Sequence, residues 1–201
     1  MKVVLASRNK NKVKEIKAIY KSIVGKELDI LSLDDIGYGD EIEENDNSFE
    51  ENATIKASVP ASLGYIGLAD DSGLAVDALG GAPGIYSARY SGEGATDQKN
   101  NAKLLQNLDG VTDRSAKFVC VFSAVAPDGK VITVRGECPG IIAEKESGSG
   151  GFGYDPLFIY PPLGKTFGEL SSQEKNEVSH RARALSLLIP KLSEFLDGYK
   201  D

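Results

Sequence analysis

The sequence predicts an α/β fold in which a mixed central β-sheet is covered by helices. Strand-like apolar runs alternate with segments of helical periodicity, and one long hairpin adds an antiparallel pair of strands. The 201 residues and the 41% hydrophobic content are enough for a substantial core. No internal repeat or flexible linker interrupts the chain, so we expect residues 1–201 to form a single domain.

In the first half of the chain, short apolar runs alternate with amphipathic segments. Strands are expected at residues 3–6, 28–33 and 66–69, where a few apolar residues stand between polar turns. Helices are expected at residues 13–23 and 48–63, and the second opens with the capping pattern Ser48-x-x-Glu51. The polar run Asp-Asp-Ser-Gly at residues 70–73 would end the third strand in a turn.

In the second half, a helix that starts at Thr96 and Asp97 precedes the hairpin. Its strands, 116–126 and 131–137, flank turn-forming residues at 127–130. A Gly- and Ser-rich connection leads to residues 152–156, which the apolar residues 157–159 follow. The capping pattern Ser171-x-x-Glu174 precedes a last helix, which Pro190 should kink or interrupt.

Composition excludes several classes of function. The chain has 23 Lys and Arg against 30 Asp and Glu, a net charge of −7, which argues against a nucleic-acid polymer as partner. The single histidine rules out a site built on two imidazoles, so a metal would be held by carboxylates, which suit a hard ion such as Mg²⁺. Cys120 and Cys138 lack zinc or redox spacing and indicate buried thiols in a reducing compartment. With no leader or membrane-spanning run in the sequence, we expect a cytoplasmic protein without a membrane partner.

The polar turn at residues 7–12 is a candidate anion site. It lies between a strand and a helix N-terminus, where backbone N–H groups and the helix dipole favour a negative charge. Asn9 would add a donor and Lys12 a cation, although a solvated helix cap explains the same residues. The pattern of a Walker loop is absent.

Two adjacent carboxylates, Asp70 and Asp71, follow an apolar strand. Because side chains alternate faces along an extended chain, one would face a ligand and the other would support it. The acidic stretch Asp40–Asp46 has no periodicity, and its residues 41–44 could supply a second metal ligand. A strand-ending turn and a solvated acidic loop are the structural alternatives.

An aromatic pair around a glycine, Phe152-Gly153-Tyr154, could form the wall of a base pocket. Lys175 and the pair His180-Arg181 supply hydrogen-bond donors that suit a carbonyl oxygen or a phosphate. Core packing of the aromatic residues and a solvated polar face explain the same residues without a ligand.

Taken together, these motifs resemble the inosine triphosphate pyrophosphatase family, the XTP/dITP diphosphatases. The matching blocks occur in family order at residues 5–12, 48–53, 69–74, 79–90, 151–156 and 179–182. Each short block is weak alone, but the run from Asp70 to Tyr90, with the Phe-Gly-Tyr-Asp and Ser-His-Arg blocks, is specific.

This resemblance implies Mg²⁺-dependent hydrolysis of non-standard purine triphosphates (ITP, dITP, XTP) to monophosphate and pyrophosphate, in a nucleotide cleft between two lobes of an elongated homodimeric α/β protein. It makes Asp71 the general base and a metal ligand, Glu44 the other ligand, and Asp70 and Lys12 further catalytic residues. The substrate-binding residues that it implies are Ser7, Arg8, Asn9, Lys10, Asn11, Lys12, Lys56, Ser72 and Arg89, with Phe152, Gly153, Tyr154, Asp155, Lys175, His180 and Arg181 around the base.

One position departs from the family pattern. The first turn of the family usually reads Thr-Gly-Asn, whereas this chain has Ser7-Arg8-Asn9, and Arg8 could contact phosphate or point to solvent. Two other functions stay open: a Maf-type pyrophosphatase for other modified nucleotides, and a sensor that binds a nucleotide without cleaving it. Turnover measured on a panel of nucleoside triphosphates distinguishes a Maf-type pyrophosphatase from the family that the motifs resemble. Release of pyrophosphate distinguishes an enzyme from a sensor.

Overall fold

The computed structural model describes residues 1–44 and 47–199, and its chain divides into two compact units. Unit 1 is formed by Met1–Asp71, Cys120–Gly136 and Arg181–Asp201, and unit 2 by Ser72–Val119 and Glu137–His180. Asp46, the end of the acidic stretch, lies outside the described residues. Three long strands contribute residues to both units, so the units are not consecutive halves of the sequence.

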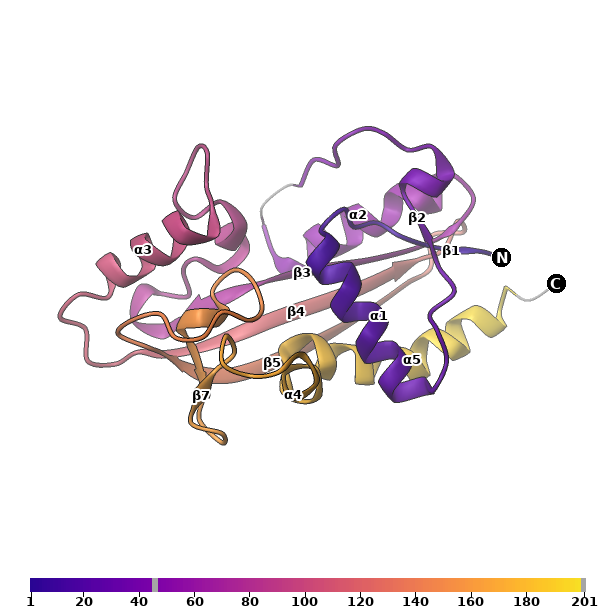
Figure 1. Ribbon diagram of the computed structural model, residues 1–201. Coiled ribbons are helices and arrows are strands. Elements are labelled where there is room, and N and C mark those ends of the chain that lie inside the picture. Colours follow the sequence, from indigo (N-terminus) through magenta and orange to yellow (C-terminus); the bar gives the residue numbers. More distant parts are fainter. Residues whose placement is uncertain (45–46, 200–201) are drawn as a thin grey trace. The chain divides into compact units, whose positions relative to one another are not determined.

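The strands form a mixed seven-stranded sheet in the order β2-β1-β3-β4-β5-β6-β7, which confirms the predicted sheet (Figure 1). Their bounds are β1 Val3–Leu5, β2 Leu31–Ser32, β3 Ile66–Val76, β4 Ser115–Val125, β5 Val131–Ile142, β6 Phe158–Tyr160 and β7 Lys165–Thr166. β1 pairs in parallel with β2 and β3, whereas β6 is antiparallel to both β5 and β7.

Five α-helices accompany the sheet in the described residues. Their bounds are α1 Lys10–Val24, α2 Phe49–Ser62, α3 Asp97–Asn107, α4 Ser172–Val178 and α5 His180–Asp197, and short 3-10 turns lie at Asp34–Ile36, Asp77–Leu79, Gly84–Arg89 and Asp155–Leu157. The Ser171–Glu174 capping box is formed as predicted. None of the helices described has both the length and the apolar character needed to cross a bilayer.

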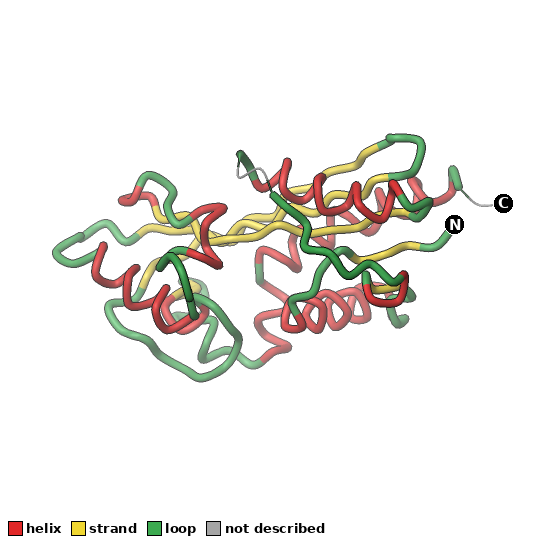
Figure 2. Tube along the Cα trace, turned by 90° about the horizontal axis from the view of Figure 1, so that it is seen from above, coloured by secondary structure: helices red, strands yellow, loops and turns green. Residues whose placement is uncertain are grey.

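The strands of unit 1 are covered on both faces, as Figures 1 and 2 show. Leu68 of β3 packs with residues of α1 and α5, such as Ile16 and Leu185, in one apolar cluster. Its neighbour Ala69 packs with Ala57 of α2 in another. The alternation of side chains along β3 therefore sends even-numbered residues toward α1 and α5 and odd-numbered residues toward α2.

Small residues let α2 approach β3 closely. Gly67 shares the α2 face of β3 with Ala69, and a Cβ atom at Gly67 would collide with the Ala57 carbonyl oxygen. Ala53 and Ala57 on the helix are fully buried. Close packing at these positions brings the polar side chains of α2 to the next odd-numbered residue of β3, which is Asp71.

Unit 2 has an apolar core of its own. It combines Leu74 of β3, Leu104 of α3, Phe118 of β4 and Phe158 and Phe167 from the C-terminal segments of the unit. The rings of Phe118 and Phe158 lie 4.5 Å apart, and those of Phe158 and Phe167 lie 4.9 Å apart. Such aromatic contacts add to the burial of apolar surface.

Both cysteines are free and buried, as the sequence predicts. Burial raises the pKa of Cys120 to about 12, so this thiol is protonated at neutral pH.

Two expectations about the extent of strands were wrong, and the last helix is not interrupted at Pro190. β3 does not stop at residues 70–73 but continues to Val76, because the apolar alternation resumes at the fully buried Leu74 and cations neutralise the two carboxylates. The second strand is only Leu31–Ser32, since β1 offers a partner of just three residues. Pro190 lies inside α5 without interrupting it, and buried Leu188 and Leu192 hold both sides of the proline on the core.

Candidate active site

The paired carboxylates of β3 lie on opposite faces of the strand, as the alternation rule predicts. Asp70 shares the face of Leu68 and meets residues of α1 and α5, whereas Asp71 shares the face of Ala69 and meets residues of α2. Each carboxylate is therefore the centre of its own polar cluster within unit 1.

Asp70 is the centre of a buried charge network. Its Oδ2 lies 3.1 Å from Lys12 Nζ and 3.6 Å from an Arg181 guanidinium nitrogen, and Arg181 also pairs with Glu15. The Asp70 side chain is fully buried. Burial by itself would raise the pKa of Asp70, but the charges of Lys12 and Arg181 outweigh it and lower that pKa to about 2. Asp70 thus stays ionised and fixes the Lys12 ammonium.

The low pKa of Asp70 predicts how stability depends on pH. The folded-state pKa of about 2 lies below the ordinary value of 3.8, so ionised Asp70 stabilises the fold above pH 3.8 and loses this effect as pH falls toward 2. We expect about 2 kcal/mol of unfolding free energy to disappear over this window. Denaturant titrations in a chelating buffer measure it, and an Asp70→Asn variant with the same slope between pH 4 and pH 2 would contradict the assignment.

Asp71 is the centre of the second cluster. Its Oδ1 lies 2.9 Å from Lys56 Nζ, its Oδ2 accepts a hydrogen bond of 3.3 Å from Asn52 Nδ2, and Lys56 Nζ lies 3.4 Å from Glu44 Oε1. Burial opposes the charged form of Lys56, but Asp71, Asp70 and Glu44 together raise the pKa of Lys56. One ammonium group therefore stands between two carboxylates from distant parts of the chain.

These carboxylates suit a hard cation. The protein ligands would be Asp71 and Glu44, which already converge on a positive charge, the Lys56 ammonium. Asn52 Oδ1, beside Asp71, is buried and has no hydrogen-bond partner among the described residues, so it could accept from a metal-bound water. The described residues hold no group of three or more His, Cys, Asp or Glu that could bind a metal. Two carboxylates with the remaining positions left to water and phosphate are typical of Mg²⁺ sites at phosphate groups.

The turn before α1 is a capped helix start. Asn9 Oδ1 accepts hydrogen bonds from the backbone N–H groups of Asn11 and Lys12, both at 3.1 Å, and Lys10 and Asn11 are exposed. Lys12 points to Asp70. The guanidinium of Arg8 instead donates to the carbonyl oxygens of Tyr38 and Asp40, in the loop that leads to Glu44.

In unit 2, hydrogen bonds hold each of the central residues of the loop Gly151–Asp155. The N–H of Gly153 donates at 2.8 Å to Asp97, the first residue of α3, and its carbonyl accepts at 3.2 Å from Asn101, one turn further along the helix. Tyr154 donates its hydroxyl to the Ser87 carbonyl, and burial raises the pKa of that phenol. Gly151 has φ 71°, and a Cβ there would collide with the Asp155 carboxylate, so only glycine fits.

Asp155 joins this loop to α4. Its Oδ2 accepts from the Phe152 N–H at 2.8 Å and from Lys175 Nζ at 2.5 Å, and the Lys175 ammonium lies 4.8 Å from the centre of the Phe152 ring. Both charged side chains are nearly fully buried. The fold therefore holds an aromatic ring and a cation together, an arrangement that suits a flat ligand with a hydrogen-bond acceptor.

The remaining predicted residues have other neighbours. His180 stacks on Phe118 with the ring centres 4.7 Å apart, and Arg89 lies exposed over the Tyr86 ring at 5.2 Å. Ser72 follows Asp71 in β3 and is partly buried. Arg181, grouped with the base by resemblance, belongs to unit 1 and to the Asp70 network.

Sequence reasoning missed four residues that shape these clusters: Glu15, Asn52, Asp97 and Asn101. Helical spacing could have found two of them. Asn52 lies one turn before Lys56, and Glu15 lies three residues after Lys12, so each shares a helix face with a predicted residue. The contacts of Asp97 and Asn101 with Gly153 join distant segments and leave no local signal.

Comparison with known proteins agrees with the resemblance found in the motifs. The sequence model of the Ham1 family matches residues 3–191. A dITP/XTP pyrophosphatase of Geobacter sulfurreducens is 52% identical over 190 residues, which cover 93% of this chain and 94% of that protein. A dITP/XTP pyrophosphatase of Clostridium perfringens is 49% identical, with coverage of 97% and 98%.

Solved structures extend the similarity to the fold. The Ham1 protein of Staphylococcus aureus superposes with a TM-score of 0.85 at 41% identity, and the match covers 100% of both chains.

Proposed function

The chain belongs to the Ham1 family, and from that premise we propose that it hydrolyses non-standard purine nucleoside triphosphates, such as dITP and XTP, to the monophosphate and pyrophosphate. Relatives named dITP/XTP pyrophosphatase support the reaction and the substrate class. The observation that carries the assignment is the convergence of Asp71 and Glu44 on one cation beside the Asp70–Lys12 pair. The reaction removes abnormal nucleotides from the pool of precursors.

Unit 1 supplies the groups that a triphosphate requires. A triphosphate repels an incoming water unless its negative charge is offset, and such electrostatic stabilisation is usually the largest catalytic contribution. Lys12 and Lys56 are held in place by Asp70 and Asp71, so their charges need little reorganisation to act on phosphate oxygens. The start of α1 adds its dipole.

Asp71 and Glu44 would hold Mg²⁺. When bound, this ion supplies charge neutralisation of the phosphates and lowers the pKa of a coordinated water. Asp71 acts as the general base that orients a water and accepts its proton during attack on the α-phosphorus. Asn52 donates to Asp71 Oδ2 and so fixes the orientation of the carboxylate. Asp70 holds Lys12 in position through their ion pair.

Unit 2 supplies the groups that distinguish the base. Hypoxanthine and xanthine carry a carbonyl oxygen at position six, where adenine carries an amino group. Lys175 donates to that oxygen, and the ring of Phe152 packs against the base. Asp155 holds both residues, since it accepts from the Phe152 N–H and from the Lys175 ammonium.

The compartment and the assembly belong to the same proposal. Two buried, free thiols are compatible with a reducing compartment, and we assign the enzyme to the cytoplasm. The enzyme acts as a homodimer on free nucleotides rather than on a nucleic-acid polymer. Light scattering of the purified chain should give twice the mass of 21.4 kDa.

Incubation with a panel of nucleotides tests the reaction. We expect dITP, ITP and XTP to yield monophosphate and pyrophosphate in the presence of Mg²⁺, with little turnover of dATP and none after addition of a chelator. Chromatography separates the products. Preference for a modified pyrimidine would favour a Maf-type enzyme, and tight binding of dITP without pyrophosphate release would favour a sensor. Formation of diphosphate and orthophosphate would contradict the bond assignment.

A further inference from the structure

We propose that Arg8 is a positioning residue for the proposed metal ligand Glu44. The inference rests on the proposed metal ligands and adds a residue to them. Arg8 would act through the backbone of the loop that carries Glu44, without contacting the metal or the substrate.

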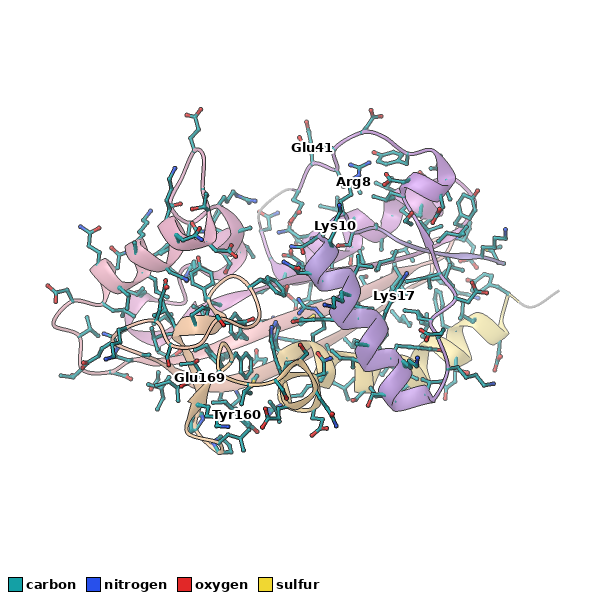
Figure 3. All side chains as sticks on the ribbon, in the orientation of Figure 1. Arg8, Lys10, Lys17, Glu41, Tyr160 and Glu169 are labelled. Atoms are coloured by element: carbon teal, nitrogen blue, oxygen red, sulfur yellow. The ribbon has the colours of Figure 1, made fainter. Side chains whose placement is uncertain are left out.

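The guanidinium of Arg8 donates two hydrogen bonds to the loop at residues 37–44, which carries Glu44. One terminal nitrogen donates to the Asp40 carbonyl at 2.8 Å, and the other donates to the Tyr38 carbonyl at 2.7 Å. Figure 3 shows the side chain extending from the start of α1 toward the loop, from which Glu41 projects outward. A planar guanidinium has five N–H donors in a fixed fork, so two bonds to alternate carbonyls constrain the backbone more than one bond would.

Two backbone hydrogen bonds also hold the start of the loop, because the Gly37 N–H donates to the Asp34 carbonyl at 3.0 Å and the Tyr38 N–H donates to the Leu33 carbonyl at 3.0 Å. Residues 37–44 contain no helix or strand, and Tyr38 and Ile42 pack only partly buried against the α2 side of the unit 1 core. At the far end, Glu44 meets Lys56 at 3.4 Å. Backbone hydrogen bonds hold the loop as far as Tyr38, and Arg8 extends this constraint to Asp40. Apolar packing holds Ile42, and Lys56 holds the Glu44 carboxylate.

This connection joins both parts of the proposed metal and phosphate site. Arg8 directly precedes Asn9, the residue that caps α1, and the first turn of α1 carries Lys12. The same residue thus fixes the loop of Glu44 to the helix start that presents Lys12. Glycine at this position could not make the connection, because it has no side chain.

Whether removal of Arg8 weakens or tightens metal binding distinguishes a positioning role from a purely electrostatic one. Loss of a positive charge from the protein should by itself tighten binding of a divalent cation. Loss of a residue that positions Glu44 should weaken binding of the cation. Mutation of residues that orient the direct metal ligands commonly changes metal affinity by about 10-fold or more. A contact with the substrate phosphates would instead raise KM and leave metal binding by the free protein unchanged.

The test is an Mn²⁺ titration of the nucleotide-free protein, with free Mn²⁺ measured by electron paramagnetic resonance. We expect Arg8→Ala to raise the dissociation constant about 10-fold, and Arg8→Lys, which keeps the charge but has one nitrogen, to give an intermediate value. Lys17→Ala is the matched control, because Lys17 is an exposed cation of α1 outside both clusters. It should leave the constant within about two-fold of wild type.

A double-mutant cycle shows whether Arg8 acts through Glu44. In a Glu44→Gln background, Arg8→Ala should add no more than about a two-fold change, because the side chain that it positions no longer binds the metal. Additive effects, tighter binding by Arg8→Ala, an unchanged constant, or no Mn²⁺ binding by the wild type would each overturn the inference. Because no nucleotide is present, a failure of the proposed hydrolysis would appear separately, as absent pyrophosphate release from dITP.

Discussion

The Asp71→Asn variant is expected to lose about 10²–10⁴-fold in kcat for dITP while it keeps its fold and its affinity for the nucleotide. An amide cannot accept the proton of the attacking water, but it preserves the shape of the side chain and can still bond with Asn52. Lys56 keeps Glu44 as an ionic partner, so the substitution does not isolate its buried charge. Stopped assays of pyrophosphate release measure kcat, and nucleotide titration measures binding.

Glu41→Gln is the control for this experiment. Glu41 is an exposed carboxylate of the same loop as Glu44, and it projects away from the protein in Figure 3. Its loss changes the net charge by the same amount and should leave kcat within about two-fold of wild type. A kcat near the wild-type value in Asp71→Asn would show that another group takes the proton. Equal losses in both variants would point to a general effect of charge.

Discrimination between dITP and dATP should be the other large effect. A site that donates hydrogen bonds to a carbonyl oxygen leaves those donors unpaired when an amino group replaces it, and such sites reject the wrong ligand by up to about 10⁴-fold. We therefore expect kcat/KM for dITP to exceed that for dATP by a factor approaching this limit. Competition between the two substrates in one reaction measures the ratio directly. Equal values would remove the proposed role of the unit 2 residues.

Lys175 can be tested for its part in this selectivity without leaving a buried charge unpaired. Lys175→Met alone would strand the buried Asp155 carboxylate, which is strongly destabilising. Combination with Asp155→Asn removes both charges and retains an oxygen for the Phe152 N–H. We expect the double variant to lose most of the dITP preference, at least about 100-fold, relative to the wild type measured in the same assay. A preserved ratio would assign selectivity to other residues.

Local patterns in the sequence predict most of the elements of this fold. Capping residues mark helix starts at Ser48, Thr96 and Ser171, because these contacts join residues close in the chain. The extent of β3 could not be predicted in the same way. Asp70 and Asp71 look like the end of a strand until their cations are known, and those cations come from α1, α2 and α5.

In the candidate site, too, local geometry could be predicted from the sequence and tertiary contacts could not. The alternation of Asp70 and Asp71 onto two faces follows from strand geometry alone and is seen in the structure. The orientation of Arg8 does not follow, since its partners are two backbone carbonyls about thirty residues away. Asn101 was missed for the same reason, because its contact with Gly153 depends on tertiary packing.

The binding of a metal-bound triphosphate at Asp71 can be tested with a crystal structure that contains Mg²⁺ and a dITP analogue in which an imido group replaces the oxygen between the α- and β-phosphorus atoms. We expect a metal bound by Asp71 and Glu44, in contact with phosphate oxygens, with Lys12 and Lys56 beside the triphosphate. A triphosphate bound away from Asp71, or a metal held without either carboxylate, would contradict this expectation.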